Sequence, residues 1–395
     1  MPITPPEKVI ILSSLYPPHL GGVEKYSESL ARALSQEFDV HVFCMNTEGL
    51  PELRRERSVT VHRLECTPLF EKRLPLPKKS ALSALEQFIE DNQVKYALIQ
   101  TRLYPFNLDA ARLFKRKGIP FCVVEHGTGH IRFKNRLANL LWPCYEHGMT
   151  AIFRQLCQTY YGVSQAAVNW LKHFKIAGKG LLHNGIDPSA FTGIDSGCRV
   201  SHQITADAIM VVFAGRILRS KGPVDLLKAC DKLNDPSLHV VIAGDGDMHL
   251  LNPWRNKERV HILGGIPHAE MLRVFKDAQI FCLPTAYPEG LPTVILEAGA
   301  LRLPVISSPA GGIVEVIHDG KTGLIVPAGN PAELSKALGR LIHDQALREE
   351  LGRNLMDLVL SEFTWESIAQ KAARIIQSHD IEQIHPAEID KKHQN

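Results

Sequence analysis

Short apolar runs alternate along the chain with longer segments whose apolar residues recur at helical spacing. In the first half, the apolar runs lie at residues 9–12, 40–43, 97–99, 121–124 and 160–163. In the second half, they lie at residues 209–214, 240–243, 280–283, 305–306 and 324–326. Short buried strands separated by helices are typical of parallel sheets covered by helices on both faces. The pattern therefore predicts an α/β protein with two doubly wound parallel sheets.

The length of the chain agrees with two domains, because 395 residues exceed one ordinary hydrophobic core. Many of residues 193–205 have short or polar side chains, which is typical of a linker. We expect a first domain over residues 1–192, a second over 206–364, a C-terminal helix over 365–380 and a polar tail over 381–395. Ligands of such sheets bind beyond the carboxyl ends of the strands, so two facing sheets would form a site in the cleft between them.

The composition is ordinary for a globular protein, with 45% hydrophobic and 22% charged residues. No stretch approaches the roughly 20 apolar residues that a membrane span needs, and we expect no signal peptide. We therefore expect a cytoplasmic protein. The eight cysteines are scattered and form no C-x-x-C pair, which indicates small buried side chains in a reducing compartment and neither disulfides nor zinc ligands.

Basic residues are concentrated between residues 112 and 179, although the net charge of the chain is only +3. This segment contains eleven lysines and arginines and two acidic residues, Glu125 and Glu146. Within it, residues 131–142 mix basic and apolar side chains, including Phe133 and Trp142. A solvated helix with one buried side explains the mixture, but the surrounding charge favours a helix that docks on the anionic inner leaflet of a membrane. Nucleic acid is not expected as a partner, because the aromatic residues form no base-stacking series.

One carboxylate lies in an otherwise apolar helix. Residues 294–301 are apolar at nearly every position except Glu297, and Thr293 is the expected N-cap. An unpaired buried charge is costly, so we expect Glu297 to have a polar partner. Seven residues separate it from Glu289, which is followed by Gly290. A glycine lets a ligand approach the backbone closely, and the helix start offers free N–H groups to an anion.

This stretch resembles the donor-sugar site of retaining glycosyltransferases with the GT-B fold, in particular the large family four. The resemblance rests on an ordered series: Glu289, seven residues, Glu297, then Pro304-Val305-Ile306, Gly311-Gly312, Glu315 and residues 320–327. It implies two Rossmann-like domains that face each other across a cleft, the first binding the acceptor and the second binding the nucleotide sugar. It also implies that Glu289 binds hydroxyls of the donor sugar and that Glu297 binds the nucleotide ribose. Gly290, Leu291 and Thr293 would complete this part of the donor site.

Further positions of the family pattern lie near the ends of predicted strands. Arg216 follows the strand at 209–214 and Lys221 precedes a helix, and in the family this pair holds the donor diphosphate. Either residue could equally be a surface base. We favour the functional interpretation, because the departing diphosphate develops negative charge that fixed cations stabilise. Ile266 lies in the segment 263–267, which resembles the loop whose backbone contacts the nucleobase.

Two places in the first half are also expected to contribute. Gly21 and Gly22 precede a helix, where they form either a plain turn or a phosphate-binding loop, and the family motif favours the second. They lack the G-x-G-x-x-G spacing of dinucleotide oxidoreductases. His126 follows an apolar strand, either as a capping residue or as the cleft-facing histidine that the family places near the donor sugar, which we favour. His130 is the reserve candidate, and Glu125 is either solvated or a partner that orients His126.

These features predict a retaining glycosyltransferase that moves a sugar from a UDP- or GDP-sugar to a hydroxyl of a glycan or lipid-linked acceptor, in cell-surface polysaccharide, lipopolysaccharide or glycolipid assembly. The catalytic residues would be His126, Glu289, Arg216 and Lys221. Family members are usually assigned a front-face mechanism, in which the leaving phosphate helps to accept the acceptor proton. We expect no cofactor. We also expect no metal, on the premise that the chain has no D-x-D metal motif. Two alternatives stay open: a GT-B protein that epimerises or only binds its nucleotide sugar, and a glycoside hydrolase with Glu289 and Glu297 as an acid/base pair.

Overall fold

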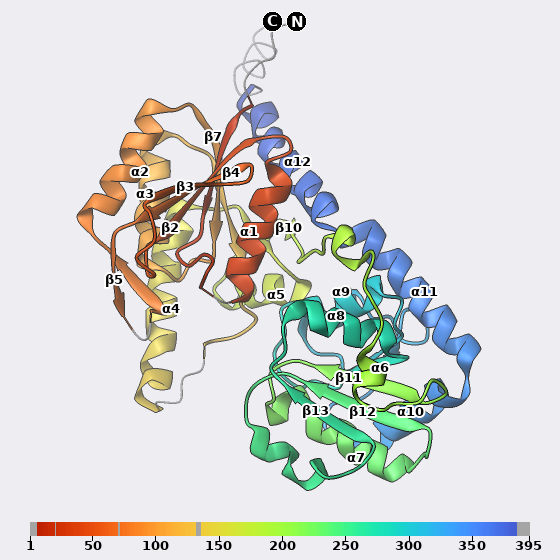
Figure 1. Cartoon of the computed structure of the whole chain (residues 1–395). Coiled ribbons are helices and arrows are strands. Elements are labelled where there is room, and N and C mark those ends of the chain that lie inside the picture. Colours follow the sequence, from red (N-terminus) through yellow and green to blue (C-terminus); the bar gives the residue numbers. More distant parts are fainter. Residues whose placement is uncertain (1–5, 20, 70–71, 132–135, 385–395) are drawn as a thin grey trace, which may run out of the picture. The chain divides into compact units, whose positions relative to one another are not determined.

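The computed structural model describes residues 6–19, 21–69, 72–131 and 136–384 (Figure 1). The chain forms two compact units, one made of Met1–His183 with Trp365–Asn395 and the other of Asn184–Thr364. The division after His183 lies earlier in the chain than the predicted boundary at residue 192. The C-terminal helix α12 (Trp365–Ile384) belongs to the first unit. It extends into the predicted tail, of which residues 385–395 lie outside the described part.

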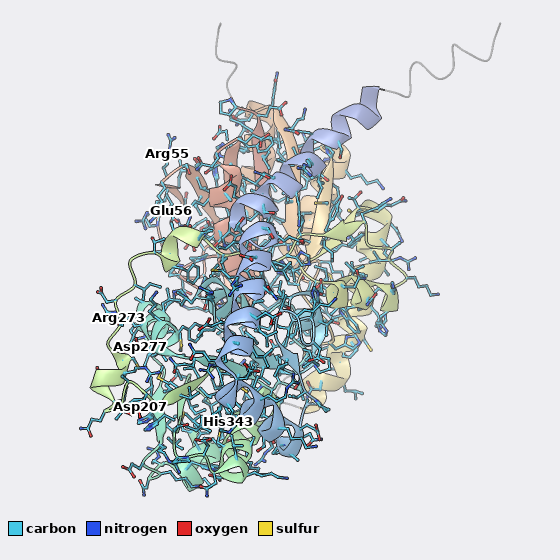
Figure 2. The ribbon with its side chains drawn as sticks, turned by 90° about the vertical axis from the view of Figure 1, so that its right-hand side faces the viewer. Arg55, Glu56, Asp207, Arg273, Asp277 and His343 are labelled. Carbon is cyan, nitrogen blue, oxygen red and sulfur yellow. The ribbon has the colours of Figure 1, made fainter. Side chains whose placement is uncertain are left out.

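The segment 193–205 is part of the second unit, so the prediction of a linker was wrong. It contains helix α6 (Cys198–Ser201). Asp277, labelled in Figure 2, ends helix α8 (His268–Asp277) and accepts hydrogen bonds from the backbone N–H of Gly197 and Arg199, at 2.9 and 3.2 Å. The Arg199 guanidinium also donates to the carbonyl of Ala208 at 3.1 Å. The polar character of the segment therefore reflects its hydrogen bonds to the rest of the unit.

The first unit is built on an eight-stranded sheet with the order β10-β9-β8-β7-β1-β2-β4-β3. Its neighbouring strands are parallel except β3 and β4. The strands are β1 (Lys8–Leu12), β2 (Asp39–Met45), β3 (Leu53–Glu56), β4 (Val59–Leu64), β7 (Val94–Gln100), β8 (Phe121–Glu125), β9 (Tyr160–Gly162) and β10 (Gly180–Leu181). A separate antiparallel ribbon joins β5 (Cys66–Leu69) and β6 (Leu74–Pro77). The sequence analysis missed β3 to β6 and β10.

Helices cover both faces of this sheet, as its apolar strands require. In β1, Val9 and Ile11 belong to one buried cluster and Ile10 and Leu12 to the other, because successive side chains point to opposite faces. The first cluster includes residues of α1 (Gly22–Leu34) and α12, which lie side by side in Figure 1. The second includes residues of α2 (Lys79–Asp91), α3 (Pro105–Lys117) and α4 (Arg136–Leu156). Helix α5 (Gln165–His173) contributes to both clusters.

The second unit contains a six-stranded parallel sheet with the order β13-β12-β11-β14-β15-β16. Its strands are β11 (Ile209–Ala214), β12 (Leu238–Ala243), β13 (Val260–Gly264), β14 (Ile280–Leu283), β15 (Val305–Ser307) and β16 (Leu324–Ile325). In chain order this is 3-2-1-4-5-6, the Rossmann arrangement, whose strand order reverses between β11 and β14. The predicted pair of doubly wound sheets is confirmed, and β13 is the strand of this unit that the sequence analysis missed.

Helices also cover the second sheet. They are α7 (Pro223–Leu233), α8, α9 (Thr293–Ala300), α10 (Pro331–His343) and α11 (Gln345–Glu362), with 3-10 turns η1 (Pro188–Phe191), η2 (Arg219–Lys221), η3 (Met248–Trp254) and η4 (Gly311–Glu315). Gly299 lets α9 approach α11 closely, since a Cβ there would lie 2.9 Å from side-chain atoms of Leu355 and Val359. All eight cysteines fall within the described residues and are free, and Cys144 alone among them is exposed.

Candidate functional site

Two loops leave the second sheet on either side of its reversal point. One follows β11 and contains Arg216 and Lys221, and the other follows β14 and contains Glu289. Because β11 and β14 are parallel neighbours, both loops start at the same edge of the sheet. Ligands of doubly wound sheets bind at this position. The sheet order therefore brings together predicted site residues that are far apart in the sequence.

Lys221 and Glu289 form an ion pair between the two loops, Nζ to Oε1. Glu289 is only 8% exposed, so the pair neutralises a largely buried carboxylate. The hydroxyl of Thr285 lies 3.4 Å from the same carboxylate oxygen and 3.2 Å from the carbonyl of Ser220. The ammonium of Lys221 also lies 4.9 Å from the centre of the Tyr287 ring. An ammonium has three N–H donors, so Lys221 retains capacity for an anionic ligand.

Arg216 is held differently from Lys221. It lies two residues beyond the end of β11 and is exposed. Within residues 6–19, 21–69, 72–131 and 136–384, its guanidinium has no hydrogen-bond or ion-pair partner. It is therefore a permanent positive charge at the carboxyl edge of the sheet, and its five donors are available to a ligand.

Glu297 has the polar partner that the sequence predicted. It is 7% exposed within the apolar helix α9, and its Oε1 lies 3.0 Å from Nε2 of His268. His268 is the first residue of α8, and the sequence analysis did not identify it. The N-cap prediction was wrong by one residue, since Pro292 is the N-cap and Thr293 is the first helical residue.

The backbone around Glu289 is fixed by close contacts. The N–H of Gly312 donates to the carbonyl of Gly290 at 2.7 Å. Gly311 has φ +57°, and a Cβ on it would lie 1.7 Å from the Glu289 carbonyl oxygen. The side-chain amide of Asn184 donates to the carbonyl of Leu291 at 2.8 Å. The loop after β14 is thus held from two sides, which orients the Glu289 side chain.

A pocket of about 340 Å³ lies next to the ion pair at the ends of β14 and β15. Its lining residues are Thr285, Ala286, Tyr287, Pro288, Ser308, Pro309, Ala310, Gly311 and Ala328. Thr285 and Tyr287 therefore contact both the pocket and the ion pair. Ser308 is 1% exposed, and its hydroxyl has no hydrogen-bond partner in the described part of the chain. A buried hydroxyl without a partner is costly, so it is suited to a polar group of a ligand in this pocket.

Ile266 lies between β13 and α8 and is partly buried. The backbone is close-packed here, because the N–H of Gly244 donates to the carbonyl of Gly264 at 2.7 Å and a Cβ on Gly265 would lie 2.1 Å from the Asp245 carboxylate. Residues 263 and 264 belong to β13 and not to the loop.

The run 245–247 does have D-x-D spacing, contrary to the premise of the metal prediction. Neither aspartate belongs to a group of three potential metal ligands among the residues searched.

In the first unit, His126 follows β8 and is held in a neutral form. Burial lowers the pKa of His126 to about 3. Its Nε2 lies 2.8 Å from Oε1 of Gln100 at the end of β7, and its ring meets Tyr26 edge-on at 4.7 Å. With an amide oxygen as its partner, Nε2 carries the proton and Nδ1 remains an acceptor. His126 can therefore accept a hydrogen bond at neutral pH, but it is not an imidazolium acid there.

Glu125 is neither solvated nor the residue that orients the His126 ring, so both interpretations of this residue were wrong. It is 1% exposed and pairs with the buried guanidinium of Arg102. Its Oε1 accepts hydrogen bonds from the backbone N–H of His126 at 3.1 Å and of Gly127 at 2.8 Å. Gln100 is the partner of the imidazole. The sequence analysis missed Gln100 and Arg102, which directly follow the apolar part of a strand.

Gly21 is the N-cap of α1 in extended conformation, and Gly22 is its first residue. The carboxylate of Glu24 occupies this helix start, since a Cβ on Gly21 would lie 2.1 Å from its Oε2. His19 Nδ1 lies 3.1 Å from the other oxygen of Glu24. A carboxylate at this position favours a hydroxyl group over a phosphate, because it accepts hydrogen bonds and repels anions.

The predicted membrane-docking segment is described only in part, since residues 132–135, including Phe133, lie outside the described residues. On α4, Leu140 and Leu141 are 71% and 57% exposed. Trp142, which was predicted to lie at the membrane surface, instead donates a hydrogen bond from Nε1 to the Glu146 carboxylate at 2.7 Å. A search of the described helices finds none with the length and apolar character needed to cross a bilayer.

Two family models match the chain, one on each half. "Glycosyltransferase Family 4" matches residues 20–190, and "Glycosyl transferases group 1" matches residues 198–356, which include the whole candidate site of the second unit. The chain belongs to the family-four-like GT-B glycosyltransferases.

Two of three similar proteins match the chain over almost its whole length, and the third matches about two thirds of it. An uncharacterized glycosyltransferase of Methanocaldococcus jannaschii is 21% identical, and the match covers 94% of this chain and 98% of the relative. TuaC of Bacillus subtilis, named as a teichuronic acid biosynthesis glycosyltransferase, is 28% identical over 64% of this chain and 63% of its own. HepE of Anabaena, solved with UDP-glucose, is 16% identical, covers 94% of this chain and 99% of its own, and has a TM-score of 0.71. The last likeness shows that the GT-B glycosyltransferase fold is shared.

Proposed function

We propose that this GT-B glycosyltransferase transfers a sugar, with retention of anomeric configuration, from a nucleoside-diphosphate sugar to a hydroxyl group. The observation that carries the proposal is the ion pair of Lys221 and Glu289 at the reversal point of the second sheet. A diphosphate needs the cations Arg216 and Lys221, and sugar and ribose hydroxyls need acceptors such as Glu289 and Glu297. HepE of Anabaena, solved with UDP-glucose, supports a donor of this class.

The reaction would depend on charge stabilisation at the leaving group. As the sugar–phosphate bond breaks, negative charge develops on the diphosphate, and Arg216 and Lys221 are positioned to stabilise it. We propose a front-face displacement in which the leaving phosphate accepts the proton of the attacking hydroxyl. His126, being neutral with Nδ1 free to accept, would bind a sugar hydroxyl and would not protonate the leaving group.

The acceptor is proposed to be a glycan or a lipid-linked glycan of cell-surface polysaccharide, lipopolysaccharide or glycolipid assembly. A named relative in teichuronic acid biosynthesis supports a polysaccharide acceptor. The exposed Leu140 and Leu141 and the basic residues of the same segment support peripheral docking on the inner leaflet of a membrane. A transfer assay with lipid extract as acceptor should therefore proceed faster with anionic than with zwitterionic vesicles.

The test starts with donor binding. In a thermal-shift panel of UDP- and GDP-sugars, the matching donor at about 100 times its Kd should raise Tm by about 5 to 10 °C, because ligand binding then stabilises the fold by about 2.7 kcal/mol. Incubation of that donor with the lipid extract should give a glycosylated acceptor whose anomeric configuration, determined by NMR, matches the donor. No Tm shift with any nucleotide sugar, together with release of free sugar from a simple glycoside, would instead support a hydrolase.

Two details of the chemistry have their own readouts in the same assay. A glycosyl-enzyme adduct trapped in mass spectrometry would contradict the front-face displacement. Donor binding without acceptor glycosylation, or with epimerised sugar, would point to the alternative of a binding or epimerising GT-B protein. Transfer is proposed to need no metal, so its rate should be unchanged in excess chelator. The rate is measured on the variant His147→Gln, which lacks one of three histidines that lie close together in the first unit.

A further inference from the structure

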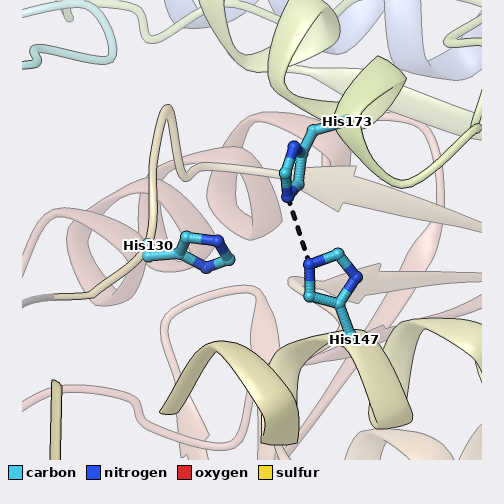
Figure 3. Close-up of side chains that lie close together, drawn as sticks. All are labelled: His130, His147 and His173. Carbon is cyan, nitrogen blue, oxygen red and sulfur yellow. Dashed lines mark hydrogen bonds between the residues drawn. The ribbon is translucent and has the colours of Figure 1, made fainter. Parts of the chain in front are cut away.

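Three histidines of the first unit converge from three separate segments. His130 lies in the loop after β8, His147 lies in α4, and His173 is the last residue of α5. Each offers a ring nitrogen, and these nitrogens lie within 4.8 Å of one another. Figure 3 shows the three rings directed toward a common space. The sequence spacing gives no sign of this cluster, because the fold alone brings these segments together.

The spacing of two of these rings already fits a metal ion. Nε2 of His147 lies 3.2 Å from Nε2 of His173. Two nitrogens bound at 2.0–2.1 Å to one tetrahedral zinc ion lie about 3.3 Å apart. The same separation also allows a hydrogen bond, which needs one protonated and one unprotonated nitrogen. A metal ion would replace the hydrogen bond between His147 and His173 by two metal–nitrogen bonds, and the two rings would keep nearly the same separation.

The third histidine has the partner that metal-binding histidines usually have. Nδ1 of His130 contacts Oε2 of Glu146, which leaves Nε2 of His130 for a ligand. Glu146 is 1% exposed, and its other oxygen accepts a hydrogen bond from Nε1 of Trp142 at 2.7 Å. A carboxylate on the second nitrogen fixes the tautomer and the ring orientation of a histidine ligand. Its negative charge would also offset part of the charge of a bound cation.

Aromatic packing limits the movement of the rings. Trp170 stacks on His173 with ring centres 4.8 Å apart and meets His130 edge-on at 4.8 Å. Phe174 lies 4.9 Å from His147. Ligands that are held in place before the metal arrives lose less conformational freedom on binding.

We propose that His130, His147 and His173 bind one transition-metal ion, preferably Zn²⁺. Neutral imidazoles favour zinc, copper or nickel, whereas calcium and magnesium prefer oxygen ligands. Three protein ligands leave a fourth position for water. The ion links the loop after β8, which begins at His126, to α4 and α5, and Glu146 acts as a positioning residue. This site shares no residue with the candidate donor site, so the proposal does not depend on the proposed function.

The experiment uses the full chain without a histidine tag, dialysed against EDTA and then transferred to chelator-free buffer. Calorimetric titration with ZnCl₂ should give one ion per chain with a Kd of about 1 μM or tighter. Cobalt(II) should give the visible absorption of a tetrahedral complex. His147→Gln and His173→Gln should each abolish stoichiometric binding, and Glu146→Gln should weaken it about 10- to 100-fold.

The matched control is His249→Gln, because His249 is exposed and belongs to the second unit. It should bind zinc like the unaltered chain. His147 and His173 are exposed as well, so circular dichroism and Tm in EDTA should show that their variants fold. Zinc binding weaker than about 100 μM by the unaltered chain, or unchanged binding by His147→Gln, would overturn the site. Unchanged affinity in Glu146→Gln would overturn the role given to that carboxylate.

Discussion

The two acidic residues of the candidate donor site pair with side chains of the second unit. Lys221 pairs with Glu289, and Glu297 pairs with His268, so both largely buried carboxylates have a partner. Under the proposed function, a diphosphate would compete for Lys221, and sugar hydroxyls would take over Glu289. The donor would then exchange existing contacts for its own, which avoids leaving a buried charge unpaired at any stage.

The variant Lys221→Met tests this arrangement, since it removes the ammonium and keeps an apolar side chain of similar length. We expect kcat/KM for the donor to fall about 10- to 100-fold, because a charge-assisted hydrogen bond contributes about 1.5 to 3 kcal/mol. Steady-state kinetics over a range of donor concentrations measures the change. Arg219→Met is the control, because Arg219 lies in the same 3-10 turn but is exposed. Equal loss in both variants would contradict a specific role for Lys221.

The residue pattern of the sequence identified the charges but not their partners. Glu297 was expected to have a polar partner because an apolar helix surrounds it. That this partner is His268 follows from the fold, which brings the start of α8 next to Glu297, and not from any local pattern. The same holds for Gln100 beside His126, and for the buried hydroxyl of Ser308 in the pocket. Residue types can predict that a contact is needed, whereas the topology decides which residue supplies it.

At the level of elements, the start of η4 supports the loop that carries Glu289. Gly311 permits this contact in two ways. Its positive φ is a conformation that residues with a side chain rarely adopt, and a Cβ would overlap the Glu289 carbonyl oxygen. The distance between η4 and the loop after β14 therefore depends on the absence of a side chain at residue 311.

Gly311→Ala should raise the Kd for the donor, in addition to lowering the free energy of unfolding. The added methyl group must push the Glu289 backbone away, so we expect at least about a tenfold higher Kd for the donor by calorimetry. Gly320→Ala is the matched control, because Gly320 has φ +69° but no atom within 4 Å of a Cβ. It should carry only the conformational cost of about 1 to 2 kcal/mol, measured by urea unfolding, with unchanged donor affinity. Equal donor affinity in the two variants would show that the loop contact does not position Glu289.

Three of the strands that the sequence failed to predict, β3, β10 and β13, share a physical reason, because each lies at the edge of its sheet. β3 is largely exposed and contains Arg54 and Arg55, so it shows no apolar run. β13 is only partly buried along its length, and β10 has two residues. Apolar runs identify strands that are covered on both faces, such as β1 and β11. Edge strands are covered less, so their hydrogen bonds to a neighbour define them and their composition does not.

For the whole molecule, we expect buried and partly buried histidines on both sheets to make stability depend on pH. His41 and His62 are hydrogen-bonded across β2 and β4 at 3.0 Å, and His239 and His261 across β12 and β13 at 3.1 Å. Burial is the main cause that lowers the pKa of His62 and of His261, each to about 4. An unfolded histidine titrates near 6.5. The unfolded chain therefore binds more protons between about pH 6.5 and 4, and the folded state loses stability as the pH falls through that window.

Urea unfolding at pH 7.5 and 5.0, with chelator present, should show this loss as a lower midpoint at the acidic pH. The double variant His62→Gln with His261→Gln should lose less between the two pH values, because glutamine keeps a hydrogen-bonding side chain and does not titrate. His249→Gln serves as the reference, since His249 is exposed. A pH dependence in the double variant equal to that of the reference would show that other groups cause the effect.

The path of the chain between its two units has a consequence for synthesis. The first unit begins at the N-terminus, yet one buried face of its sheet is completed by Ile368, Ala372 and Ile376 of α12. A growing polypeptide leaves the ribosome with all of Asn184–Thr364 before α12 has appeared. The unit that starts first is therefore the one that can finish folding only at the end of translation. A chain that ends shortly before Trp365 would contain all strands of both sheets, but the face of the first sheet that α1 covers would lack the contribution of α12.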